Sequence, residues 1–167
     1  MKKILLFTII LVAFSAGAFA QSTDTEQTTA TATIVGPLAL TKVTDMDFGT
    51  IAVTGTAGTV VLGTDNSRTA VGPALVPPAA GVAASFSVSG EASRTFIITL
   101  PADGAVTLVN GANTMVVNSF QHSMGGSPAL DGTGAAAFTV GATLSVGAAQ
   151  AAGVYNSANF PVTINYN

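Results

Sequence analysis

The sequence predicts an all-β fold, a sandwich or barrel of about seven to ten short strands. Three observations support this. Helical periodicity is nearly absent after residue 20, turn residues recur throughout the chain, and the last eight residues alternate between apolar and polar side chains. A period of two places alternate residues on one buried face, as strands require. We therefore expect stability to come from sheet pairing and a packed core.

The N-terminus has the order of a secretory signal peptide. Lys2 and Lys3 precede the apolar run 4–12, and small residues follow up to Ala20. This order predicts cleavage after Ala20, so that residues 1–20 are the signal peptide and Gln21 begins the mature protein. No later stretch is long and apolar enough to predict a transmembrane span in the mature protein. Residues 21–28 are polar and are expected to be a disordered tail.

Composition narrows the function classes. Removing residues 1–20 leaves 147 of the 167 residues, which fits one domain, expected at residues 29–167. The mature chain keeps three Lys or Arg against eight Asp or Glu, a net charge of −5, which argues against nucleic acid as a partner. The chain has no cysteine, so no disulfide supports the fold, although an exported protein would be free to form one.

The first half of the mature chain contains strand candidates followed by a proline-rich loop. Residues 29–34 alternate Thr with Ala and Ile, and Gly36-Pro37 interrupts the pattern. Residues 72–81 contain three prolines, which lack the N–H that a central strand needs, so this segment is expected to be a loop. The expected strands are at residues 29–34, 38–43, 47–53 and 59–62.

The second half carries the centre of the expected core. Asn110-Gly111 is a strong hairpin signal, and Gly141 is expected to mark a bulge within a long strand. The expected strands are at residues 84–89, 94–100, 106–109, 114–120 and 136–146. The expected core residues before the last strand are Phe48, Phe86, Phe96, Ile98, Phe120, Phe138 and Leu144.

The chain ends in an alternating segment, residues 160–167, whose apolar face consists of Phe160, Val162, Ile164 and Tyr166. Chain ends usually fray, so an apolar residue in the penultimate position indicates that the terminus belongs to the sheet. We therefore expect this end of the chain to be structural, with these four residues facing the core, and it could also serve as a docking surface.

Several segments of the mature chain together resemble a secreted bacterial family, the domain of unknown function 4402. The resemblance is carried by residues 31–35, by Pro37-Leu38, by residues 44–51 and by the closing part from Ala151 to Tyr166. The same layout is similar, more distantly, to spore coat protein U and to the subunits of chaperone-usher pili. This resemblance implies an immunoglobulin-like, pilin-like sandwich, exported through the periplasm to the surface of a Gram-negative bacterium or beyond it.

The pilus resemblance also implies a mode of assembly. In those subunits the last strand borders a groove that a periplasmic chaperone fills first and the N-terminal extension of the next subunit fills afterwards, by strand addition. The resemblance implies that the groove strand used in assembly here consists of Phe160, Val162, Ile164 and Tyr166. Ala30, Ala32 and Ile34 could supply such a donor strand, or could form the first strand of their own domain. The expected partners are therefore further copies or related surface subunits, and a periplasmic chaperone.

The sequence offers no conventional catalytic or metal centre, and we expect no enzymatic activity and no cofactor. His122 is the only histidine and has no Asp or Glu in its local segment. Asp45-x-Asp47 and residues 64–67 offer oxygen atoms for calcium, but Asx turns explain the same residues.

The sequence leaves three functions to be weighed. The principal expectation is a structural subunit of a surface fibre or coat. The alternative is a self-contained secreted monomer that binds a surface ligand or carbohydrate through its loops, and a hydrolase built around His122 is a third. A hydrolase would require a carboxylate and a hydroxyl beside His122 in one cleft.

Overall fold

The computed structural model describes residues 23–78 and 80–167, so the predicted signal peptide, residues 1–20, and Gln21 lie outside the described part. The described residues form strands and no helix, which confirms the all-β prediction. Their compact unit spans Val35–Asn167. The strands are β1 (Ala39–Thr44), β2 (Ile51–Ala52), β3 (Gly58–Leu62), β4 (Arg68–Val71), β5 (Ala74–Leu75), β6 (Ala84–Ser89), β7 (Phe96–Thr99), β8 (Val106–Asn110), β9 (Asn113–His122), β10 (Ala135–Val146), β11 (Asn156–Ser157) and β12 (Thr163–Tyr166).

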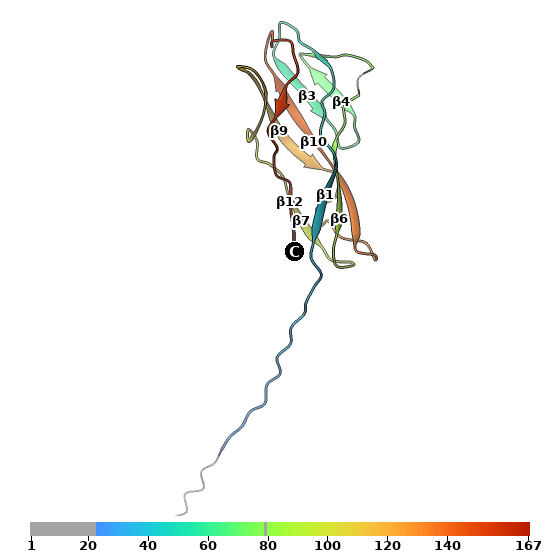
Figure 1. The fold of residues 1–167 in the computed structure, drawn as a ribbon, viewed down its shortest axis with the longest axis vertical. Coiled ribbons are helices and arrows are strands. Elements are labelled where there is room, and N and C mark those ends of the chain that lie inside the picture. Colours follow the sequence, from blue (N-terminus) through green and yellow to red (C-terminus); the bar gives the residue numbers. More distant parts are fainter. Residues whose placement is uncertain (1–22, 79) are drawn as a thin grey trace, which may run out of the picture. The chain divides into compact units, whose positions relative to one another are not determined.

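Strand β10 organises the larger sheet (Figure 1). Its first half pairs antiparallel with β6, from Ala135 to Val140, and its second half pairs with β3, from Ala142 to Val146. Strand β9 pairs with β10 on the other edge. Gly141 stands between the β6 and β3 pairings. The register with β9 shifts between Gly141 and Thr143, where two steps along β10 face three steps along β9, from Gln121 to Asn118. The extra residue therefore lies in β9, where Ser119 has a φ of 52°, and not in β10 as predicted.

The alternation in β10 explains why a strand of 12 residues is stable in this position. Phe138, Val140, Ala142, Leu144 and Val146 are all buried, and they face the interior of the unit. The intervening positions carry small or hydroxyl side chains such as Thr139 and Ser145. One strand therefore contributes side chains to both halves of the core.

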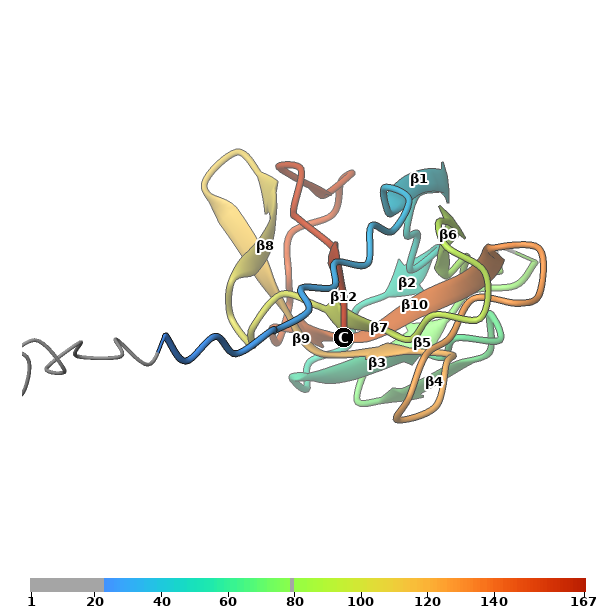
Figure 2. The same cartoon turned by 90° about the horizontal axis from the view of Figure 1, so that it is seen from below.

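A second, smaller sheet contains only β12 and β7, paired antiparallel with Ile164 opposite Ile98 (Figure 2). Phe96 in β7 is 1% exposed and packs with Phe86 and Phe138 of the larger sheet. The phenyl rings of Phe86 and Phe138 stack with their centroids 5.1 Å apart. This half of the core therefore lies between the two sheets, as in a sandwich.

The local signals placed several elements correctly. β8 and β9 form the predicted hairpin, with Gly111 at a φ of 60° in the turn. β6 and the start of β7 supply fully buried residues, which confirms the predicted centre of the core. β6 and β7 do not pair with each other. β6 pairs with β1 and β10, and β7 pairs with β12.

Three expectations about strands were wrong. Residues 29–34 form no strand; the first strand of the described chain is β1, which already occupies the outer edge of β6. The expected proline-rich loop contains a two-residue strand, β5, which pairs with β2. β4 and β11 were not expected, because neither segment has a strong alternating pattern. Whether each of these segments forms a strand depends on a sheet edge to pair with, and that edge is formed by residues far away in the sequence.

Gly141 tests the packing of β10. A Cβ atom there would overlap the carbonyl oxygen of Leu62 in the neighbouring strand. We expect Gly141→Ala to lower the free energy of unfolding by about 1–3 kcal/mol, because backbone must move to accept the methyl group. Chemical denaturation would measure the change.

Gly125→Ala is the matched control, since a Cβ at Gly125 meets no atom within 4 Å. Its unfolding free energy should stay within about 0.5 kcal/mol of the wild type. Equal stabilities for the two variants would contradict this close approach of Gly141 to the backbone of β3.

Candidate assembly edge

The smaller sheet has an edge with no strand beside it. Within the described residues, β12 pairs with β7 alone. The main-chain N–H of Asn167 donates to Thr95 O at 3.2 Å, whereas that of Phe96 turns away from β12 and donates to Pro128 O at 2.9 Å. Main-chain groups alternate in direction along an antiparallel pair. Those of Ile164 and Tyr166 therefore point toward the free edge of β12.

The side chains of this strand divide between solvent and core. Ile164 and Tyr166 are half-buried and pack against the cluster around Phe96, as does Val162 just before the strand. Thr163 and Asn165 are exposed on the other face. The predicted alternation is thus present, but β12 begins at Thr163 instead of at residue 160. Pro161, which has no N–H to donate, precedes it.

Phe160 belongs to a different part of the core from the other three predicted groove residues. Its ring contacts Phe120 at a centroid distance of 5.5 Å, and it packs against the cluster that contains Phe48 and Leu144. The structure therefore brings Val162, Ile164 and Tyr166 together and places Phe160 at the neighbouring cluster.

The hydroxyl of Tyr166 fixes the end of β12. It accepts a hydrogen bond from Glu91 N at 2.7 Å and donates one to Gly36 O at 3.1 Å. The Glu91 carboxylate in turn accepts from Gly36 N at 3.2 Å. A Cβ at Gly90 would overlap the Tyr166 hydroxyl, so glycine makes room for it. The Tyr166 side chain therefore connects the first residues of the compact unit to β12 by hydrogen bonds.

Sequence reasoning selected Tyr166 but missed its partners. Gly36 and Glu91 are 130 and 75 positions away from it along the chain. No local pattern marks either of them, because one contributes only main-chain atoms and the other contributes its amide. Only the fold could reveal this contact.

The predicted donor residues Ala30, Ala32 and Ile34 precede the compact unit and are exposed. Ile34 is 95% exposed, an unusual state for a large aliphatic side chain. They lie in an extended stretch without strand pairing.

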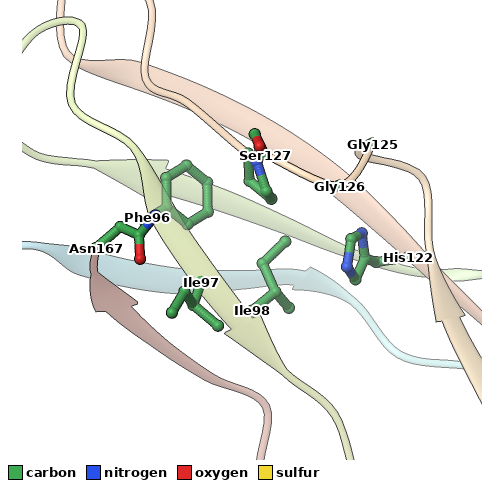
Figure 3. Close-up of a pocket in the computed structure, with 9 residues that line it drawn as sticks. Phe96, Ile97, Ile98, His122, Gly125, Gly126, Ser127 and Asn167 are labelled. Carbon is green, nitrogen blue, oxygen red and sulfur yellow. The ribbon is translucent and has the colours of Figure 1, made fainter.

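His122 lines a cavity of about 180 Å³ together with β7 residues and the glycine-rich loop 125–128 (Figure 3). Its Nδ1 atom is buried and has no hydrogen-bond partner. Ser127 and Asn167 also line this cavity, and no Asp or Glu side chain does. The carboxylate that a hydrolase would need is therefore not among the lining side chains.

The loop carboxylates form turns. Asp47 Oδ1 accepts from Gly49 N at 2.7 Å, and Asp65 Oδ1 accepts from both the hydroxyl and the amide of Ser67. The Ser67 hydroxyl bond lowers the pKa of Asp65 below its ordinary value. These are the Asx turns expected from the sequence. No group of three or more His, Asp or Glu in the described part of the chain is arranged to hold a metal ion.

Asp131 closes the turn before β10. Its Oδ1 accepts from the amides of Ala135 and Thr133 and from the Thr133 hydroxyl, at 2.7–3.0 Å. These bonds, the Ala135 amide foremost, lower its pKa below the ordinary 3.8. The ionised form is thus favoured by folding.

The family described as a domain of unknown function (DUF4402) matches residues 38–166, which is most of the chain. No curated protein and no solved structure matches the sequence. The match begins at Leu38 and so includes every strand of the compact unit.

Tyr166→Phe removes the hydroxyl and should lower the free energy of unfolding by about 1 kcal/mol, since two hydrogen bonds at a half-buried site are lost. Amide hydrogen exchange of Glu91 should accelerate in this variant, because its acceptor is gone. In the control Tyr155→Phe, which removes a hydroxyl bonded to Ala151 O, the Glu91 exchange rate should not change.

Asp131 predicts a pH dependence. A lowered folded-state pKa means that its stabilisation is complete above the unfolded value near 3.8 and is lost as pH falls through the folded value. The difference in unfolding free energy between wild type and Asp131→Ala should therefore shrink below pH 3.8. Asp131→Asn cannot titrate, so its difference from Asp131→Ala should stay constant over this range.

Proposed function

Because the chain belongs to the DUF4402 family of domains of unknown function, whose description assigns no activity, we propose its role from the sheet edges. We propose that the protein is an exported, non-enzymatic structural subunit of a bacterial surface fibre or coat. The observation that carries the proposal is the free edge of β12 in a sheet of only two strands. The resemblance to pilus subunits and spore coat protein U agrees with this role.

An exposed edge is a template for another strand. Unpaired main-chain groups on a sheet edge readily bind an extended segment, and natural monomers usually protect such edges. β12 carries no Lys, and its inward side chains Ile164 and Tyr166 are half-buried and pack against the same core cluster as half-buried Leu38 and Leu40. An added strand would gain hydrogen bonds along the edge and would cover this apolar surface.

The segment before the compact unit has the composition to supply that strand. Residues 29–34 alternate Thr with Ala and Ile, and Val35 follows; the segment carries no charge and presents Ile34 to solvent. Residues 23–28 are too polar to cover an apolar surface. We propose donor-strand exchange between copies, with the signal peptide directing export and a periplasmic chaperone protecting the edge before assembly.

One observation favours a second function. The cavity beside His122 has an unsatisfied buried nitrogen and a loop containing Gly125 and Gly126. A self-contained secreted monomer could bind a small surface ligand or carbohydrate through this loop.

No helix within the described residues has the length and apolar character needed to span a bilayer.

Light scattering on mature protein, residues 21–167, tests the proposed assembly. We expect SDS-resistant oligomers whose fraction rises with protein concentration. Deletion of residues 21–35 should abolish them. A monomer at every concentration, with or without the deletion, would favour the ligand-binding alternative.

A matched pair of variants separates a specific donor strand from a general effect of charge. Ile34→Asp places a carboxylate on the face expected to enter the groove, whereas Thr33→Asp places it on the opposite face. Assembly should be lost in the first variant and retained in the second. Equal assembly by both would argue against donation by residues 29–35.

A further inference from the structure

The cavity beside His122 lies where β7 loses its neighbour on the edge opposite β12 (Figure 3). The loop 128–130 pairs antiparallel with the start of β7, through the hydrogen bond from Phe96 N to Pro128 O at 2.9 Å. Residues 125–127 come next along this edge. They line the cavity and form no bridge to β7 in the described chain. The pairing of this edge therefore stops at the cavity.

The main-chain groups of Ile98 point toward the cavity. The hydrogen bond from Asn167 N to Thr95 O means that Thr95, and by alternation Ile97, faces β12. Phe96 and Ile98 therefore direct their N–H and C=O groups to the opposite edge of β7, where Phe96 has its loop partner. Ile98 lines the cavity, and its N–H has no partner among the described residues. A ligand in the cavity can therefore accept a hydrogen bond from this N–H.

His122 offers a second hydrogen-bonding group, from β9. Its Nδ1 atom is buried without a partner, whereas Nε2, which also lacks a partner among the described residues, is not fully buried. Polar groups inside a protein that make no hydrogen bond are uncommon and call for an explanation, such as a bound molecule. In a neutral imidazole one nitrogen donates and the other accepts. With the proton on Nδ1, Nε2 can accept from a ligand N–H.

The size and lining of the cavity select a small uncharged group. Its volume of about 180 Å³ exceeds the roughly 15 Å³ that one water needs and is below the roughly 300 Å³ of sites for drug-sized ligands. No Asp, Glu, Lys or Arg side chain lines it, so no opposite charge would offset the desolvation of an ionised group. Phe96 and Pro128 contribute apolar surface to the lining.

We propose that this cavity binds a secondary acetamide group, CH3–CO–NH–, of a larger ligand. The carbonyl oxygen accepts from Ile98 N–H, the N–H donates to His122 Nε2, and the methyl group lies against Phe96 and Pro128. A trans amide directs its C=O and N–H in opposite directions. This arrangement matches a donor from β7 and an acceptor from β9, and the rest of the ligand stays outside the cavity.

The inference rests on the second, ligand-binding function proposed above, and it adds the chemical group that the cavity recognises. It makes no use of the free edge of β12. Two kinds of molecule carry a secondary acetamide: amino sugars with an N-acetyl group, and peptides with an acetylated amine. The hydrogen bonds and the methyl contact are the same for both, so the experiment must distinguish these sources.

Nuclear magnetic resonance on isotope-labelled mature protein, residues 21–167, tests the site with three probes. N-acetylglucosamine carries the acetamide on a sugar, N-acetylalaninamide carries it on an amino acid, and glucose is the matched sugar without it. We expect both acetamide probes to shift the amide signals of Ile98 and Gly126, and glucose to shift neither. The probe that saturates at lower concentration identifies the source. Unchanged signals with both acetamides, or equal shifts with glucose, would overturn the proposal.

Amide hydrogen exchange provides an internal control, because neighbouring residues of β7 face opposite edges. In the free protein Ile98 should exchange much faster than Ile97, whose N–H bonds to β12. Saturation with the tighter-binding acetamide probe should slow Ile98 at least about tenfold and leave Ile97 unchanged. Equally slow exchange of both residues in the free protein would show that Ile98 N–H already has a partner, which would overturn the proposed donor.

A pair of variants tests the acceptor. His122→Phe keeps a planar ring and removes both nitrogens, so the acetamide probes should bind about tenfold more weakly. Gln121→Ala, at the next position of β9 and exposed, should bind them as the wild type does. Equal affinities of the two variants, in proteins whose amide spectra show the native fold, would overturn the role of His122.

Light scattering on the same samples separates this inference from the fibre role. Assembly of a protein that binds neither acetamide probe would overturn the acetamide site and leave the fibre subunit supported. Binding by a protein that stays monomeric at every concentration would support the site and the ligand-binding function, and would refute the fibre role.

Discussion

The structure depends on the double pairing of β10. A central strand must satisfy hydrogen-bonding groups on both edges, and β10 does so with β6 and β3 on one edge and β9 on the other. Gly141 allows the change from β6 to β3, because a side chain there would overlap Leu62. Since the inward residues of β10 enter both core clusters, its position fixes the sheet that every other element packs against.

The smaller sheet, which packs against the β6 and β10 part of the larger sheet, contains two of the described strands. β7 and β12 bury Phe96 fully but leave Ile164, Tyr166, Leu38 and Leu40 half-buried. A third strand beside β12 would complete both the hydrogen bonding and the apolar cover. The proposed role as a fibre or coat subunit meets this requirement with a strand from a second chain.

The comparison of sequence with structure shows where local patterns suffice. β10 and the β8–β9 hairpin were predictable, because each rests on alternation or turn chemistry within a few residues. The bulge expected in β10 at Gly141 lies in the facing strand β9 instead. Residues 29–34 have equally good alternation and form no strand, since β1 already holds the edge of β6. Alternation shows that a segment can be a strand and does not show which edge receives it.

By itself the sequence determined the all-β class, the buried faces of the long strands and the apolar alternation that ends in Tyr166, because these follow from a period of two and from turn residues. The tertiary structure alone decided that β12 has β7 as its one partner among the described strands, that Phe160 joins a different cluster from Ile164, and that Tyr166 is bonded to Gly36 and Glu91. These contacts join residues far apart in the chain, where one-dimensional patterns carry no information about which edges meet.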